Sequence, residues 1–176
     1  MWIGIALLLY VRVMAFDNIT DDRITELLQM PKVVQNPNAR ETTEDGHIRL
    51  NYQVKSMDGE HHFELFTRQN KRLEECFSCG LQWITNSGKL ILCRYNGGGH
   101  RHDNKIEKTS FERGHCHIHT TTARYIQAQY NAEGFAQTTD GFKTMRGALH
   151  LLLKDCHIRG LDIPPDQPDL FVRICG

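Results

Sequence analysis

The strongest constraint on the fold of this chain is the strand-like pattern of residues 47–95, which begins with a period-two alternation of apolar and polar residues as far as Leu65. Ile48, Leu50, Tyr52 and Val54 alternate with polar residues, and the sequence MDGE that follows is typical of a tight turn. Two further apolar segments flank the turn sequence NSGK. Because successive side chains of a strand point to opposite faces, this pattern predicts two β-hairpins with one buried face.

Helical periodicity flanks this strand region on both sides. Acidic residues begin the segment 20–30, its apolar residues share one face and a proline follows it, which predicts a helix. Residues 142–156 repeat apolar side chains at helical spacing and predict an amphipathic helix. We expect a short strand at 115–119, a further helix at about 121–130, and a loop in the polar stretch 35–46.

This order of elements predicts an α+β fold with a mainly antiparallel sheet. The sheet would contain two hairpins and a short strand, with an N-terminal helix and two C-terminal helices packed on it. A length of 176 residues and a hydrophobic fraction of 40% suit one domain with its own core. We expect residues 17–160 to form that domain, residues 1–16 to be an apolar N-terminal extension, and residues 161–176 to be a proline-rich C-terminal tail.

The apolar start of the chain lacks the features of a membrane segment or a secretory signal. The run Trp2–Val11 is too short to span a bilayer, and Arg12 follows it directly. There is no positive region before the run and no clear small-residue cleavage site after it. A chain of this length and apolar content does not need its six cysteines as a disulfide framework. We therefore expect a cytoplasmic protein with reduced thiols and no membrane partner.

The formal net charge of zero conceals two halves of opposite sign. Residues 17–64 carry five Lys and Arg against ten Asp and Glu, a balance of −5. Residues 65–160 carry fourteen against eight, a balance of +6, and they contain most of the histidines. A locally basic, histidine-rich region suits an anionic ligand such as a phosphate. The alternative is that the two halves simply attract each other.

Five of the ten histidines lie within the stretch GGGHRHDNKIEKTSFERGHCHIH. If residues 115–119 are extended, their three histidines point to one face, and the cysteine and isoleucine between them point to the core. His100, His102 and Asn104 have the same spacing of two. If the two stretches pair as strands, all six side chains share one surface.

One chemistry open to this surface is acid–base cleavage of a phosphodiester. A neutral histidine removes a proton from a ribose 2′-hydroxyl, and a protonated histidine donates to the leaving oxygen. A cation then stabilises the charge on the phosphorus centre. We expect His102 and His117 to be acid and base, in either order. The candidate ligand-binding residues are Arg94, His100, Arg101, Asn104, His115, His119 and Arg124.

A second chemistry is metal binding. His115, His117 and His119 at alternate strand positions could supply three ligands to zinc. Cys76 and Cys79 form a separate CxxC motif that resembles half of a zinc site, although no second pair follows at the usual spacing. The alternative for these two cysteines is packing as small apolar side chains beneath a hairpin.

A third chemistry follows from a resemblance. The sequence HCHIHTT resembles the motif of histidine-triad nucleotide-binding proteins, in which the middle histidine is the nucleophile. The resemblance implies that His117 has this role. Thr120 and Thr121 replace the apolar pair of that motif, and its preceding phosphate loop is missing at the expected distance.

The sequences LCRYNGGGHRHDN and GHCHIH together resemble the core of the TumE-like bacterial toxins. The resemblance extends over roughly residues 45–157 in element order. It implies a toxin–antitoxin role, with growth inhibition through RNA or translation and a small cognate antitoxin as partner. The matching positions are Arg94, Tyr95, Asn96, His100, His102, His117 and His119.

The prediction from sequence is thus a toxin-like protein that binds RNA through a histidine–arginine cluster. Cleavage of that RNA without a metal, as an endoribonuclease, is left open. Two other classes also remain open. One is a zinc-binding or non-catalytic interaction module, and the other is a nucleotide-binding protein of the histidine-triad type.

Overall fold

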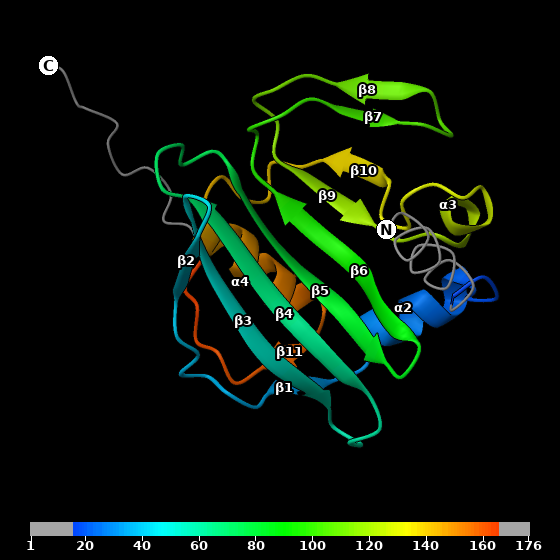
Figure 1. Ribbon diagram of the computed structural model, residues 1–176, viewed down its shortest axis with the longest axis vertical. Helices are drawn as coiled ribbons and strands as arrows, with labels where there is room; N and C mark the ends of the chain where they lie inside the picture. The colour runs from blue at the N-terminus through cyan, green and yellow to red at the C-terminus, as the bar shows by residue number, and fades with distance from the viewer. Residues whose placement is uncertain (1–15, 166–176) are drawn as a thin grey trace, which may run out of the picture.

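The computed structural model describes residues 16–165, and its frame is a nine-stranded sheet (Figure 1). The strands of this sheet are β1 (Lys32–Val34), β2 (Thr42–Glu44), β3 (His47–Ser56), β4 (His62–Asn70), β5 (Phe77–Thr85), β6 (Gly88–Asn96), β9 (His117–Thr120), β10 (Phe135–Thr138) and β11 (Ile158–Arg159). Their order is β10-β9-β6-β5-β4-β3-β1-β11, and β2 pairs with β3. Strands β1 and β11 pair in parallel, and the other pairs are antiparallel. The predicted α+β class with a mainly antiparallel sheet is confirmed.

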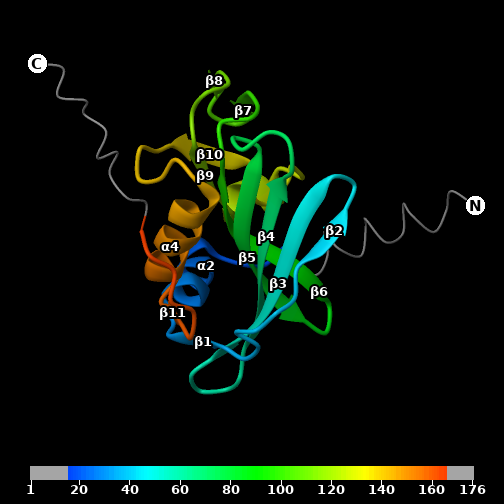
Figure 2. The same cartoon turned by 90° about the vertical axis from the view of Figure 1, so that its left-hand side faces the viewer.

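Two of the helices cover one face of this sheet. In Figure 2, α2 (Asp21–Gln29) and α4 (Met145–Asp155) lie on the same side of strands β3 to β6. Each helix has a threonine at its N-cap: the Thr20 hydroxyl accepts from the backbone N–H of Arg23, and the Thr144 hydroxyl accepts from that of Gly147. The short helix α3 (Ala123–Gln127) follows β9.

The core lies between the sheet and these helices. Leu27 of α2, Leu65 of β4, Leu81 of β5 and Leu152 of α4 are all 0% exposed. Burying a leucine side chain contributes about 1.5–3 kcal/mol to folding, so these contacts hold both helices on the sheet. Neither α2 nor α4 lies on the opposite face of β4, β5, β6 and β9, and that face holds the histidines.

A second, two-stranded sheet stands beside the large one. It consists of β7 (His102–Asn104) and β8 (Thr109–Phe111), which pair with each other. Figure 1 shows this hairpin above strands β9 and β10. The predicted pairing of residues 100–104 with residues 115–119 is therefore wrong, because β7 takes β8 as its partner and β9 lies between β6 and β10.

Several short elements differ from the sequence-based expectation. The expected loop at 35–46 contains β2, and the expected helix at 121–130 is limited to the five residues of α3. Gln129 adopts a left-handed backbone conformation with φ of 60°, which cannot continue a helix. Strands of two to four residues carry too little periodicity to be recognised from sequence.

The two chain ends lie largely outside the described residues. The expected apolar extension falls there except for Phe16, and the expected proline-rich tail is described only as far as residue 165. Within residues 16–165, none of the helices combines the length and the apolar character that crossing a bilayer requires.

The glycine triplet after β6 allows close contact between segments. A β-carbon at Gly97 would overlap the backbone carbonyl oxygen of Glu75, and one at Gly99 would lie 2.5 Å from the Cys76 sulfur. The φ angles of these glycines are not in the left-handed region. Glycine is therefore required in this triplet because a larger residue would not fit, and the close packing of the triplet places His100 against the sheet.

We predict that Gly97→Ala lowers the free energy of unfolding by about 1–3 kcal/mol, because the backbone around Glu75 must shift to admit the methyl group. Chemical denaturation of the full chain measures this change. Gly141→Ala is the matched control, since its new methyl group meets the flexible Leu151 side chain at 3.0 Å. Equal stability of the two variants would contradict the prediction.

Candidate metal centre

Strand register brings four polar side chains together on the open face of the sheet. Asn96 of β6 lies opposite His117 of β9, and Arg94 lies opposite His119. Directly paired residues of neighbouring strands point to the same face. Tyr95, between the two β6 residues, points the other way and donates its hydroxyl to Asp155 at the end of α4. Asn96, His117, Arg94 and His119 therefore form one cluster on the face without helices.

The β7–β8 hairpin is fastened over this cluster by Asn104. Its amide nitrogen donates to the carbonyl of Ala136 at 2.9 Å, and its amide oxygen accepts from the N–H of Ala136 at 2.8 Å. Ala136 belongs to β10, the edge strand of the large sheet. Asn104 thus pairs with that edge as a strand would, and it satisfies backbone groups that the edge leaves open.

The fastened hairpin buries two histidines. The ring of His102 stacks on that of His117, with centroids 5.8 Å apart, and meets the His119 ring edge-on at 4.6 Å. Phe111 of β8 covers His117 from the other strand of the hairpin, at 4.9 Å. His117 is 0% exposed and His119 is 3% exposed. The β7–β8 hairpin therefore supplies the cover for these two rings.

The backbone fixes the tautomers of both buried rings. The Nδ1 atom of His117 lies 3.0 Å from the carbonyl oxygen of His115, and that of His119 lies 2.9 Å from the carbonyl oxygen of Glu133. A carbonyl oxygen can only accept, so each Nδ1 carries the proton and each Nε2 keeps a lone pair. The Nε2 atom of His119 is buried without a hydrogen-bond partner. That of His117 lies 3.4 Å from the amide nitrogen of Asn96.

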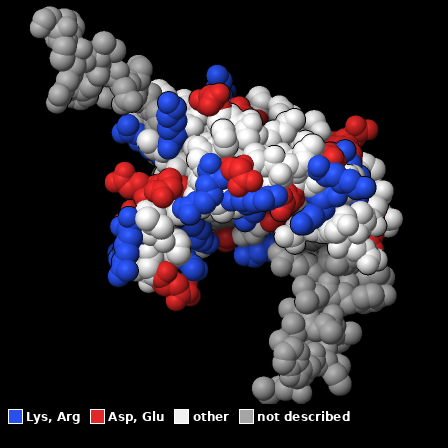
Figure 3. Space-filling model, turned by 90° about the horizontal axis from the view of Figure 1, so that it is seen from above, with Lys and Arg blue, Asp and Glu red and all other residues white. Residues whose placement is uncertain are grey.

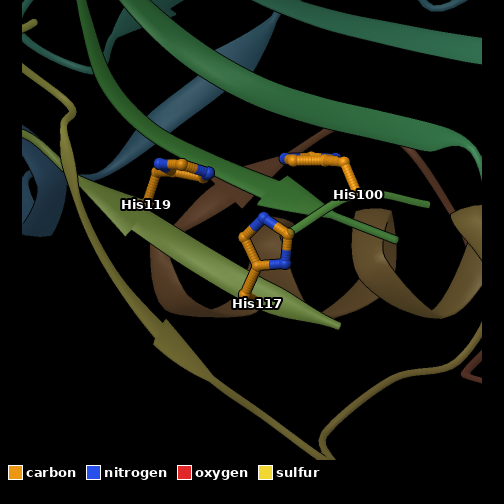
Figure 4. Close-up of side chains that lie close together, drawn as sticks. All are labelled: His100, His117 and His119. Atoms are coloured by element: carbon orange, nitrogen blue, oxygen red, sulfur yellow. The ribbon is translucent and has the colours of Figure 1, made fainter. Parts of the chain in front are cut away.

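His100 completes a group of three imidazoles. One ring nitrogen from each of His100, His117 and His119 lies within 4.8 Å of the other two, and Figure 4 shows the three rings around a shared space. Within residues 16–165, this is the one group of three side chains that could hold a metal ion. Tetrahedral zinc binds imidazole nitrogens at about 2.0–2.1 Å, so a small inward movement would complete such a site. His100 is exposed and follows the glycine triplet, which places it at the rim.

The environment keeps these rings neutral at pH 7. Burial lowers the pKa of His117 to about 4 and that of His119 to about 3, and nearby cations add to the effect. Burial and the charge of Arg94 also lower the pKa of His100. Neutral imidazole is the form that ligates a metal. The three rings therefore offer lone pairs without first losing a proton.

The structure places four of the predicted site residues away from the shared space. Asn104 docks the hairpin as described. His115 is exposed and lends its carbonyl oxygen, rather than its ring, to His117. Arg101 is exposed and pairs with Asp103 at 3.0 Å. Arg124 pairs with Glu107 on the side of α3.

Ion pairs of this kind dominate the hairpin end of the molecule. Seen from that end, basic and acidic side chains lie next to one another (Figure 3). Arg101, Asp103, Lys105 and Glu112 belong to one such network. The two basic side chains of this network are therefore balanced by its two acidic ones.

The CxxC cysteines do not join a larger set of metal ligands among the described residues. Cys79 is 0% exposed in the core on the helix side, and burial raises the pKa of its thiol. Cys76 contacts the glycine triplet at the base of the loop. Their surroundings match the alternative in which they pack as small apolar side chains.

Sequence reasoning did not identify Arg68, which faces the same side of the sheet as Asn96 and His117. The register of β4, β5 and β6 connects Arg68 through Ser78 to Asn96. The alternation of β4 puts Arg68 on the same face of its strand as Glu64 and Phe66. Its relation to the histidines depends on the strand order, which the sequence does not contain.

The fold and the site together define an α+β protein with a three-histidine cluster, of which His117 and His119 are buried, on the sheet face opposite α2 and α4. Comparison of the chain with protein-family models, with curated proteins and with solved structures found no match.

We predict that Asn104→Ala lowers the free energy of unfolding by about 2–3 kcal/mol, because both backbone groups of Ala136 lose their partner. Hydrogen exchange should increase across residues 100–119 as the hairpin loosens. Asp103→Ala is the control, because the exposed Asp103 carboxylate pairs with Arg101 and takes no part in the contacts between Asn104 and Ala136. Unchanged exchange in the Asn104 variant would show that other contacts hold the hairpin.

We also predict that the metal-free protein loses stability on acidification. The unfolded chain takes up protons on both histidines near the ordinary pKa of 6.5, whereas the folded pKa values are about 4 for His117 and 3 for His119. Between these limits the unfolded state binds more protons, so the free energy of unfolding falls as pH falls from about 6.5 to 4. Denaturation at several pH values measures this slope.

The slope should flatten in a His117→Asn, His119→Asn double variant and persist in His62→Asn, which alters an exposed histidine. A wild-type protein whose unfolding is independent of pH between 4.5 and 7 would contradict the assignment of both rings as buried and neutral.

Proposed function

We propose that this chain is a metal-binding protein that holds zinc, or a similar transition-metal ion, with His100, His117 and His119. The supporting observation is the pair of buried Nε2 lone pairs whose Nδ1 atoms are fixed on backbone carbonyls. Metal-ligating histidines usually donate their other ring N–H in this way, which fixes the tautomer and the ring orientation. Imidazole ligands suit zinc, copper, iron and nickel.

Three protein ligands leave a tetrahedral ion with an open position. Structural zinc sites are usually closed by four side chains, whereas catalytic sites keep one position for water or substrate. The fold also has a full hydrophobic core apart from the cluster, so it does not need a metal to hold it together. The open position would face the exposed rim at His100, and a water bound there would become a nucleophile near neutral pH.

The geometry supports this proposal better than metal-free acid–base catalysis by His102 and His117. A carbonyl oxygen, that of Gly134, lies 3.1 Å from the Nε2 atom of His102, so that nitrogen carries a proton that is already bonded. His117 is 0% exposed. Acid and base must both reach the reacting atoms, and neither of these nitrogens is free to do so.

Action on RNA and a bacterial toxin–antitoxin role remain predictions from the sequence. Basic side chains beside the histidines, with Arg94 nearest in register, support an anionic ligand as the candidate substrate class. A metal-bound water next to a phosphodiester would be compatible with RNA hydrolysis. A cognate antitoxin would be identified as a protein that binds this chain in the cell.

We predict that the metal-free full-length protein binds one Zn²⁺ or Co²⁺ per chain. Bound Co²⁺ should show the intense visible absorption of a tetrahedral site, and isothermal titration gives the stoichiometry. His117→Asn and His119→Asn should each weaken binding at least 100-fold, because each removes one of three ligands. His100→Asn should weaken it as well.

His115→Asn and His62→Asn are the matched controls, because both rings are exposed and lie outside the cluster. They should bind the metal as the wild type does. Absence of stoichiometric binding by the wild type, or equal binding by the His117 and His119 variants, would overturn the proposal. Circular dichroism of each metal-free variant checks that it is folded.

A further inference from the structure

A basic hollow lies next to the three histidines on the open face of the sheet. Its volume is about 340 Å³, and His100 forms part of its wall together with Arg94 and Asn96 of β6. Arg68 of β4 and His47 of β3 form the opposite wall. None of the described residues that line it is Asp or Glu. The hollow therefore combines two guanidinium groups with no carboxylate in its wall.

Buried polar atoms without partners gather at this place. Six buried side-chain nitrogen or oxygen atoms among the described residues have no hydrogen-bond partner. Three of them are the Nε atom of Arg94, the Oδ1 atom of Asn96 and the Nε2 atom of His119, and of these only the Arg94 atom is a donor. A fourth belongs to Arg49, which lies opposite Arg68 in register. Buried polar groups are nearly always bonded, so a group of orphans calls for a ligand or ordered water. The Nε atom of Arg94 is a donor and requires an acceptor.

The two arginines are held differently. Arg68 donates through one terminal nitrogen to the carbonyl of Thr67 at 2.6 Å and to that of Leu50 at 3.3 Å. Its guanidinium also lies 5.3 Å from the centre of the Phe66 ring. These contacts fix Arg68 and use only one of its nitrogens. The position opposite Arg94 in β5 is Gly80, so no side chain from that strand covers Arg94.

Charge strengthens the case for an anion. Arg94 lies opposite His119 in register, and none of the ion pairs among residues 16–165 includes Arg94. A divalent ion on these histidines would add two positive charges beside Arg94. At effective protein dielectric constants, such like-charge contacts are unfavourable unless an anion lies between them.

We propose that the hollow binds a phosphate group that bridges the metal and the two arginines. This inference rests on the metal site proposed above. One phosphate oxygen would occupy the open metal position, and the remaining oxygens would accept from Arg94 and Arg68. Arg94, Arg68 and His100 all line the hollow, and phosphate oxygens accept well from guanidinium groups. Arg94 and Arg68 are therefore ligand-binding residues, and the ligand of this protein bears phosphate.

Titration of the Co²⁺-loaded full-length protein with inorganic phosphate tests this assignment. Direct coordination should change the visible absorption of the Co²⁺ ion in a saturable manner. Arg94→Met and Arg68→Met should each weaken phosphate binding about 10- to 100-fold, since each removes a charged donor. Their affinity for Co²⁺ should stay within about threefold of the wild type or rise, because neither residue is a metal ligand. Arg101→Met should leave phosphate binding unchanged, because Arg101 pairs with Asp103 outside the hollow.

The outcomes separate this inference from the metal site. If Co²⁺ binds but phosphate leaves its spectrum unchanged, or both arginine variants bind phosphate as the wild type does, the phosphate assignment is wrong and the metal site stands. If Co²⁺ does not bind, the metal site is wrong. Phosphate binding to the metal-free protein with undiminished affinity would exclude the bridging arrangement. Arg94→Lys keeps the positive charge and should bind phosphate more tightly than Arg94→Met. It also serves as the test variant if Arg94→Met does not fold.

Two further probes distinguish the source of the phosphate. Adenosine 5′-monophosphate carries a terminal phosphate, and an adenylyl dinucleotide without terminal phosphates carries an internal diester. If only adenosine 5′-monophosphate competes with inorganic phosphate for the site, the ligand is a phosphate monoester. If the dinucleotide competes, the ligand is a nucleic-acid backbone. Failure of both, with inorganic phosphate also unbound, would overturn the assignment.

Discussion

The site in this protein depends on two hydrogen bonds between the Asn104 side chain and the backbone of Ala136. They attach the β7–β8 hairpin to the edge strand β10, and the hairpin then covers the sheet face opposite α2 and α4. Without that cover, His117 and His119 would be solvated rings with ordinary protonation behaviour. With it, burial lowers the pKa of both rings and the cluster is neutral at pH 7.

The two faces of the sheet have different roles, because one stabilises the fold and the other carries the site. On one face, Leu65 and Leu81 pack against Leu152 and supply the apolar burial that stabilises the protein. The other face carries Arg94 and His119, which contribute little apolar burial. Because the core is complete on the first face, the second can hold unpaired polar atoms at a cost that the fold tolerates. Such a division is expected where a site is built on a rigid scaffold.

The local sequence pattern predicted the strands and helices better than it predicted which strands lie next to one another. Alternation identified the strands around Tyr52 and placed His117 and His119 on one face, since both properties depend on residues two apart. It failed for His115, which lies before β9 begins, and for the pairing of β7, which is set by the docking of Asn104 far along the chain. Arg68 was missed for the same reason, because only the strand order brings β4 to β6. Contacts between distant segments carry no periodic signal.

The central claim is that three imidazoles, and no thiolate, hold a metal ion. X-ray absorption at the zinc edge of the zinc-loaded full-length protein tests it most directly, because nitrogen and sulfur ligands lie at different distances from zinc. The account predicts nitrogen or oxygen scatterers at about 2.0–2.1 Å with the multiple-scattering pattern of three imidazoles, and no sulfur. A sulfur shell at about 2.3 Å would place zinc on cysteines such as Cys76 and contradict the account.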